Sequence, residues 1–139
     1  MGYMRHHAII VTGPATGGGV LGGIENVRAK VQEIAGAECA NAFCKNPQLV
    51  SGVLKSLTND YATFVVAPDG SKEGWDDSAR GDKMRDKVIE YLERLRWEDG
   101  STSFAYVEVQ YGDDEHETKV CRNSDTRRRR DRKSKVRQA

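Results

Sequence analysis

The sequence predicts an α+β fold: a small, mostly antiparallel sheet with two helices on one face. Two observations lead to this prediction. Helical apolar stripes over 24–35 and 79–96 alternate with β-branched and aromatic runs of strand character. The resulting order of strand, helix, hairpin, helix and hairpin allows both helices to cover one sheet. We expect a single domain over residues 1–121 and a disordered basic tail over residues 122–139.

The first elements are a strand, a Gly-rich segment and a helix. The run HHAIIVTG at 6–13 is apolar on both faces, as in the central strand of a sheet. Glycines at 12–23 then follow a strand and precede a helix, which is the setting of a phosphate-binding loop. Neither the Walker spacing nor a dinucleotide fingerprint is present, so we favour a flexible connector. Apolar residues every three or four positions predict a helix over 24–35 that Gly36 ends.

The next stretch supports two interpretations. Asn46 and Pro47 suit the cap and first position of a helix. The residues LVSGVLKSL followed by TND suit one arm of a hairpin equally well, and we favour the hairpin over 47–57. Its second arm is YATFVVA at 61–67, which is rich in aromatic and β-branched residues.

A polar turn, a second helix and two strands complete the domain. PDGS at 68–71 has the residues of a tight turn. DDS at 76–78 offers helix caps, and a second apolar stripe predicts a helix over about 79–96. FAYVEVQY at 104–111 alternates, which predicts a strand with one solvated face that carries Glu108 and Gln110. HETKVC at 116–121 can return as an edge strand.

Charge and cysteine content narrow the class of protein. Residues 122–139 carry a net charge of +7, whereas residues 1–121 carry −6. No apolar run reaches the length of a membrane span or of a signal-peptide core, so we expect no membrane contact and a cytoplasmic location. Three cysteines form no metal-binding spacing, and their odd number argues against a secreted disulfide framework. We therefore expect Cys39, Cys44 and Cys121 to be reduced.

The histidines do not form a catalytic or metal-binding pattern. His6 and His7 have no serine, cysteine or carboxylate partner at a telling spacing, and the additional donors of a metal site are missing. His116 lies in the acidic segment GDDEHE, which lacks the ligand order of a calcium loop. We interpret at least one of His6 and His7 as a structural or surface group and His116 as part of a solvated hairpin turn, and we expect no metal, no cofactor and no enzymatic activity.

The turn before the second helix is the strongest candidate for a binding site. The segment DGSKEGWDDSARGDKMR includes Lys72, Arg80, Arg85, the hydroxyl of Ser71 and the indole of Trp75. Such groups can hold a phosphate and stack against a base. A tryptophan that only fills the space under a loop is the alternative, and the sequence leaves both interpretations open.

The tail suggests a second function. RRRRDRK can neutralise several phosphates, which predicts salt-sensitive attachment to nucleic acid without sequence preference. The tail has no interleaved aromatic residues that would stack on bases, so a solubilising or localisation role is the alternative. A third possibility is an inhibitor that covers a host protein by direct contact.

Three segments together resemble a known group of proteins. RHHAIIVTG, VVAPDGSKEGWDDSARGD and WEDGSTSFAYVEVQYGDDEHET, which cover roughly half of the chain, resemble blocks that occur in the same order in a family of small bacteriophage-encoded proteins. That family is similar to the Thoeris anti-defence proteins, which sequester a cyclic signalling nucleotide without cleaving it. The Gly-rich loop and the segment 37–49 are longer than in the family, and the basic tail is unusual, so loop-borne contacts do not carry over.

The resemblance implies a phage counter-defence protein that acts in the host cytoplasm as a homo-oligomer built from dimers, with pockets at subunit boundaries. Its ligand would be a small cyclic nucleotide or an ADP-ribose derived signal. Sequestration requires tight binding and an intact ligand, and no chemistry. The residues that we expect to bind the ligand are our own inference from the sequence: Arg5, His7, Arg28, Phe64, Asp69, Ser71, Lys72, Trp75 and Arg80.

Overall fold

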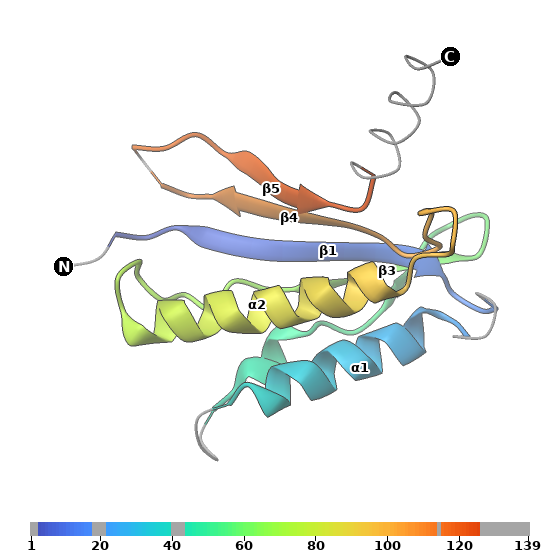
Figure 1. Cartoon of the computed structure of the whole chain (residues 1–139), viewed down its shortest axis with the longest axis horizontal. Helices are drawn as coiled ribbons and strands as arrows, with labels where there is room; N and C mark the ends of the chain where they lie inside the picture. The colour runs from blue at the N-terminus through green and yellow to red at the C-terminus, as the bar shows by residue number, and fades with distance from the viewer. Residues whose placement is uncertain (1–2, 18–21, 40–43, 114, 126–139) are drawn as a thin grey trace.

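The computed structural model describes residues 3–17, 22–39, 44–113 and 115–125. Within them, one antiparallel sheet has the strand order β2-β3-β1-β4-β5, and helices α1 and α2 both lie on the same side of it (Figure 1). The elements are β1 (His6–Pro14), α1 (Ile24–Ala37), the 3₁₀ turn η2 (Asn46–Leu49), β2 (Leu54–Lys55), β3 (Tyr61–Val66), α2 (Asp76–Arg94), β4 (Ala105–Tyr111) and β5 (Lys119–Asn123). The predicted α+β class is confirmed.

The core lies between the sheet and the two helices. β1 is the central strand, as predicted, and its Ile9 and Val11 are fully buried against the helices. Phe64 of β3 pairs with Val11 and is 1% exposed. From the helices, the apolar stripes supply the other half of the core: Ile24, Val27, Val31 and Ala35 from α1, and Met84, Val88, Ile89 and Leu92 from α2. Helical periodicity therefore determines which residues meet the sheet.

α1 differs from its predicted bounds at its C-terminal end, and α2 differs at both ends, since it stops at Arg94 and not at residue 96. α1 does not end at Gly36 but continues to Ala37. Carbonyls of its last turn accept hydrogen bonds from the backbone N–H groups of Glu38 and Cys39. α2 begins at Asp76, three residues before the predicted start. Its N-cap residue is Trp75, which offers no capping side-chain bond, and the acidic residues of the DDS segment lie in the first turn, where the helix dipole favours negative charge.

The ambiguous segment contains both predicted features in succession. Asn46–Leu49 forms one 3₁₀ turn with proline near its start, and β2 then pairs antiparallel with β3. The favoured hairpin is confirmed in part: of the predicted arm, Leu54 and Lys55 pair with β3 and Val50 adds an isolated bridge to Val66, while the helical alternative holds for four residues. The hairpin turns at Asn59 and Asp60, which adopt positive φ angles of 63° and 54°. Asn and Asp tolerate this conformation better than most residues.

The polarity of β4 is the reverse of the prediction. Glu108 and Gln110 face the helices and are 3% and 5% exposed, so their side of the strand is not solvated. Arg85 of α2 and Arg122 of β5 supply charged partners that make the burial of Glu108 possible. We call the opposite side of the sheet the open face. Its side chains are those of His6, Ala8, Ile10, Thr12, Leu54, Tyr61, Thr63, Val65, Ala105, Val107, Val109, Tyr111, Val120 and Asn123.

The cysteines do not follow the prediction. Cys39 and Cys44 form a disulfide with a Cα–Cα distance of 5.4 Å, so the expectation that they are reduced is wrong. The end of α1 and the residues before η2 come together in the fold, and the sequence spacing alone did not show this. Cys121 is a free, exposed thiol.

The folded region extends past the predicted boundary at residue 121. β5 runs to Asn123, and the side chain of Ser124 is buried and accepts a bond from the backbone N–H of Tyr106 at 3.0 Å. Residues 122–125 therefore belong to the domain and not to the tail. The predicted disorder of 126–139 lies outside the described residues. Neither helix in the described part of the chain is long and apolar enough to cross a membrane.

Candidate functional site

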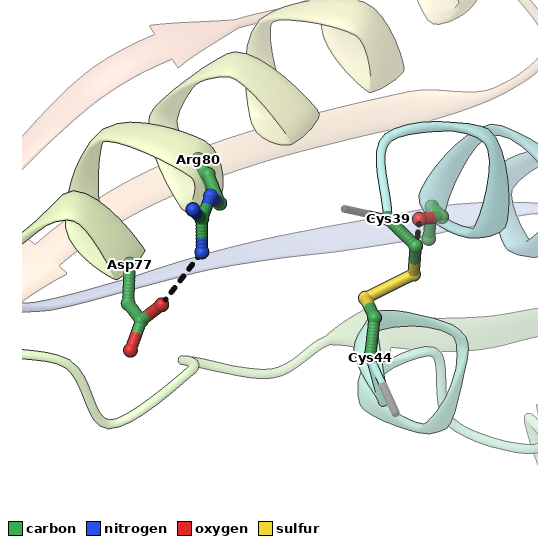
Figure 2. Close-up of a disulfide and its surroundings, with 5 residues drawn as sticks. Cys39, Cys44, Asp77 and Arg80 are labelled. Carbon is green, nitrogen blue, oxygen red and sulfur yellow. Dashed lines mark hydrogen bonds and ion pairs between the residues drawn. A yellow bond between two sulfur atoms is a disulfide. The ribbon is translucent and has the colours of Figure 1, made fainter. Parts of the chain in front are cut away.

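A cleft on the helix side of the sheet contains most of the residues predicted from the turn before α2. It lies between the end of α1 with its disulfide and the first turns of α2 (Figure 2). Its volume is about 520 Å³, which is in the range of small-molecule sites. The lining residues are Glu38, Cys44, Lys45, Asn46, Asp69, Gly70, Ser71, Trp75, Asp77 and Arg80.

Asp69 shapes one wall of the cleft. Its Oδ1 accepts bonds from the backbone N–H of Ser71 at 2.9 Å and from the Ser71 hydroxyl at 2.7 Å. Gly70 between them has a φ of 77°, which glycine adopts without strain. A Cβ at Gly81 would collide with Oδ2 of Asp69, so any other residue there would require the Asp69 carboxylate to shift. Asp69 and Ser71 therefore line the cleft, but their side chains hydrogen-bond within the turn itself.

Trp75 provides an aromatic surface at the cleft. Its side chain sits at the N-cap position of α2, and the residue is 48% exposed, so the indole does not fill a joint inside the protein. The ammonium of Lys72 lies 5.7 Å from the centroid of the indole ring, within the range of a cation–π contact. A half-exposed indole beside a cation can stack with a base and place a positive charge near its phosphate.

The charges of the cleft are more balanced than the sequence suggested. Each of its three carboxylates has a basic partner: Asp77 has Arg80 at 3.3 Å, Glu38 has Lys83 at 3.7 Å, and Asp69 has Arg85 at 3.9 Å. Figure 2 shows Asp77 and Arg80 on α2, across from the disulfide. No carboxylate of the described residues pairs with Lys45 or Lys72. Lys45 lines the cleft and Lys72 lies beside it against Trp75, so both ammonium groups are available to bind a phosphate.

Four of the nine predicted binding residues lie elsewhere. Phe64 is buried in the core, so it cannot stack with a ligand, and this prediction is wrong. Arg28 donates from Nε to the carbonyl of Ser51 at 2.6 Å. Arg5 pairs with Asp113 at 3.3 Å, and His7 lies 3.2 Å from Glu73. The fold brings together Asp69, Ser71, Trp75 and Arg80, with Lys72 beside them.

Sequence reasoning missed the other wall of the cleft. Glu38, Cys44, Lys45 and Asn46 come from the end of α1 and the start of η2, which the disulfide ties together. Asp77 was identified only as a cap candidate. The available signal was the pair of cysteines five positions apart, because a disulfide there brings Cys44 and the residues after it close to the end of α1.

A second cleft of about 430 Å³ lies against β4 and β5 and is lined by His7, Asp82, Arg85, Asp86, Glu108, Cys121 and Arg122. Its charged groups bind one another. Arg122 contacts both Glu108 and Asp86, and Arg85 donates to Asp82 at 2.5 Å. Because these charges are already compensated, we assign this cleft a structural role.

His6 and His116 make structural contacts, whereas His7, which we expected to bind the ligand, lies beside Glu73 and outside the cleft. The ring of His6 packs 5.5 Å from that of Tyr111, and His116 Nδ1 lies 2.5 Å from Asp113. The pKa of Asp113 is held below its usual value, first by the backbone N–H of Glu115 and then by His116 and Arg5. No group of three His, Cys, Asp or Glu residues in the described ranges could hold a metal ion.

Comparison of the chain with protein families, with curated proteins and with solved structures finds no match. The candidate function therefore rests on the chemistry of the cleft and on the sequence resemblance.

Proposed function

We propose that the protein binds a small phosphate-bearing nucleotide in the cleft between α1 and α2 and retains it unchanged. The observation that carries this proposal is the half-exposed indole of Trp75, with Lys72 at 5.7 Å, at the wall of a cleft of about 520 Å³. Stacking supplies affinity for the base, and the unpaired lysines supply affinity for the phosphate.

The charge pairs of the cleft set limits on the ligand. Arg80 is held by Asp77 and both side chains are more than half exposed, so this pair is weak and a phosphate can compete for the guanidinium. Glu38, Asp69 and Asp77 would repel a ligand of high charge density. A nucleotide with one or two phosphates therefore fits this lining better than a triphosphate does.

The resemblance to anti-defence proteins suggests the biological role of this binding, which is sequestration of an immune signal. In such a role the ligand is a cyclic immune signal, such as a cyclic nucleotide or a cyclic ADP-ribose isomer, and sequestration in the host cytoplasm removes it by mass action. The proposal includes no reaction, so the ligand leaves the protein as it entered. Inhibition of the host signal is then proportional to the number of protein molecules.

Calorimetry with cyclic nucleotides, cyclic ADP-ribose isomers and inorganic phosphate tests the proposal. We expect Trp75→Ala to weaken nucleotide binding by about 5- to 150-fold, which corresponds to the ~1–3 kcal/mol of base–aromatic stacking. Trp75→Phe should retain most of the affinity. Trp97→Ala is the matched control, because Trp97 is 46% exposed and does not line the cleft.

Two results would contradict the proposal. The first is the absence of heat with every nucleotide, and the second is an equal loss of affinity in the Trp75→Ala and Trp97→Ala variants. Mass spectrometry of the ligand recovered after heat denaturation tests retention, since a cleaved product would show that the protein is an enzyme.

Nucleic-acid binding through the basic tail is the second candidate, and the +7 charge of residues 122–139 favours it. Its test is a truncation that removes the tail and leaves the folded residues intact. The chain must end after Asp125, because Arg122 and Ser124 belong to the fold. Loss of DNA and RNA retention in this variant supports tail-borne binding, while unchanged retention excludes it.

A further inference from the structure

We propose that the open face is the contact surface of a symmetric dimer of this chain. Both helices cover the other side of the sheet, and Figure 1 shows no described element over the open face. At its centre, Ile10 of β1 stands between Val65 of β3 and Val107 of β4 in the strand register. The middle of this surface is therefore aliphatic.

The open face is partly exposed and uncharged. Ile10 is 38% exposed, Val120 is 54% and Leu54 is 75%. None of the strand residues that form this face is Asp, Glu, Lys or Arg, because the charged strand residues fall on the helix side of the register: Lys55, Glu108, Lys119 and Arg122. Large exposed apolar patches mark interaction surfaces, and depletion of charged residues is typical of interface centres.

The burial of Glu108 contributes to this arrangement. A strand with one solvated face normally turns its acid to water, but in β4 the acid is inside and Val107 and Val109 are outside. Arg85 and Arg122 hold Glu108 on the helix side at 4.0 Å and 2.7 Å. Placing a paired charge inside and two valines outside is unfavourable for a monomer, and it is explained if the valines are covered in a dimer.

The size and symmetry of the face favour a second copy as its partner. Strand spacings give a sheet of about 24 by 20 Å, or roughly 500 Å² in projection. Two such faces in contact would bury roughly 1,000 Å² in total, which is at the lower limit for a specific interface. A twofold contact puts the same surface on both sides, and a face without charges can do this without repulsion. Residues 126–139 carry eight basic residues and only Val136 and Ala139 as apolar ones, so they are poorly suited to cover it.

The dimer would leave the nucleotide cleft accessible. The cleft is formed on the helix side by residues of a single chain, so packing of two sheets through their open faces directs the two clefts outwards. This arrangement differs from pockets at subunit boundaries. It is independent of the proposed function, because either one can hold without the other.

Sedimentation velocity with the full-length chain tests the dimer. We expect a species of twice the 15.5 kDa chain mass, and we expect Ile10→Lys to convert it to the monomer, with a dissociation constant at least about a hundredfold higher. Ala29→Lys is the matched control, since Ala29 is exposed on α1 and lies on the other side of the sheet. Circular dichroism confirms that each variant is folded. If Ile10→Lys does not fold, Val120→Lys on the edge strand replaces it.

A charge exchange shows whether the two open faces meet. Ile10→Glu alone should also be monomeric, and an equimolar mixture of Ile10→Glu and Ile10→Lys should recover the dimer mass, because the central residues of two faces approach each other across the twofold axis. The proposal is wrong if the wild-type chain is monomeric, including the case in which its open face binds a different protein. It is also wrong if the wild-type dimer is unaffected by charge at both Ile10 and Val120.

Discussion

Arg122 of β5 and Glu108 of β4 form a bidentate ion pair, in which Nε donates to Oε1 at 2.7 Å and Nη2 donates to Oε2 at 2.9 Å. These bonds raise the pKa of the Arg122 guanidinium above its usual value. Glu108 is 3% exposed and Arg85, on its other side, is 4% exposed. The carboxylate of Glu108 thus links the edge strand β5 to the helix α2, and it compensates the charge of the buried Arg85.

Removal of this carboxylate should destabilise the whole domain. We expect Glu108→Ala to lower the free energy of unfolding by about 3 kcal/mol, because it takes one partner from the buried Arg85 and both bonds from Arg122. Urea denaturation measures the change. Glu90→Ala is the control, since Glu90 forms an exposed pair with Lys87, and its loss should cost less than about 1 kcal/mol. Equal effects of the two substitutions would show that Glu108 is not a stabilising centre.

The position of the domain boundary can be tested by two truncations. A chain that ends after Cys121 loses Arg122 and also Ser124. The hydroxyl of Ser124 accepts a hydrogen bond from the backbone N–H of Tyr106, and its carbonyl accepts one from Arg96. We expect its melting temperature to fall well below that of the full chain. A chain that ends after Asp125 should melt as the full chain does. If the two truncated chains have equal stability, residues 122–125 do not belong to the fold.

The disulfide predicts a specific count of reactive thiols. Under denaturing conditions without reductant, alkylation and mass spectrometry should find one modified cysteine, Cys121, and three after reduction. The double substitution of Cys39 and Cys44 by serine should cost about 2 kcal/mol, as estimated for closure of a short loop. It should also weaken nucleotide binding, because Cys44 lines the cleft. Three reactive thiols without reductant would contradict the disulfide.

The Cys121 thiol should react slowly at neutral pH. Partial burial is the main cause that raises its pKa above 9.0, and the nearby Glu108 adds to it. Since the thiolate is the reactive form, the native protein should be alkylated more slowly than the urea-unfolded chain at pH 8. The difference should narrow as the pH rises through the pKa of the folded state. Equal rates at pH 8 would contradict this prediction.

Asp113 should contribute to loss of stability in acid. Its pKa is lower in the folded state than in the unfolded chain, first because of the N–H of Glu115 and further because of His116 and Arg5. Its contribution is therefore complete above the unfolded pKa of 3.8 and is lost as the pH falls through the lower folded value. Thermal melts from pH 5 downwards should show a smaller decline for Asp113→Asn than for the wild type. Parallel declines would contradict this role.

Most of the fold was accessible from local patterns, while only part of the candidate site was. The spacing of apolar residues located both helices and the central strand, because periodicity depends on near neighbours along the chain. The turn from Asp69 to Arg80 was recognised from its mixture of basic, polar and aromatic residues. Phe64 was assigned to the site because an aromatic residue suggests stacking, whereas strand alternation places it in the core.

The sequence by itself determined the α+β class, the two helices on one face and the polar turn beside Trp75, since each depends on residues that are close together in the chain. Only the tertiary structure decided which side of β4 is buried. Glu108 can turn inwards because Arg122 and Arg85, distant along the chain, meet it there. In the same way, the opposite wall of the cleft exists because the disulfide joins Cys44 to Cys39 at the end of α1, and no local periodicity in the sequence predicts a contact of this kind.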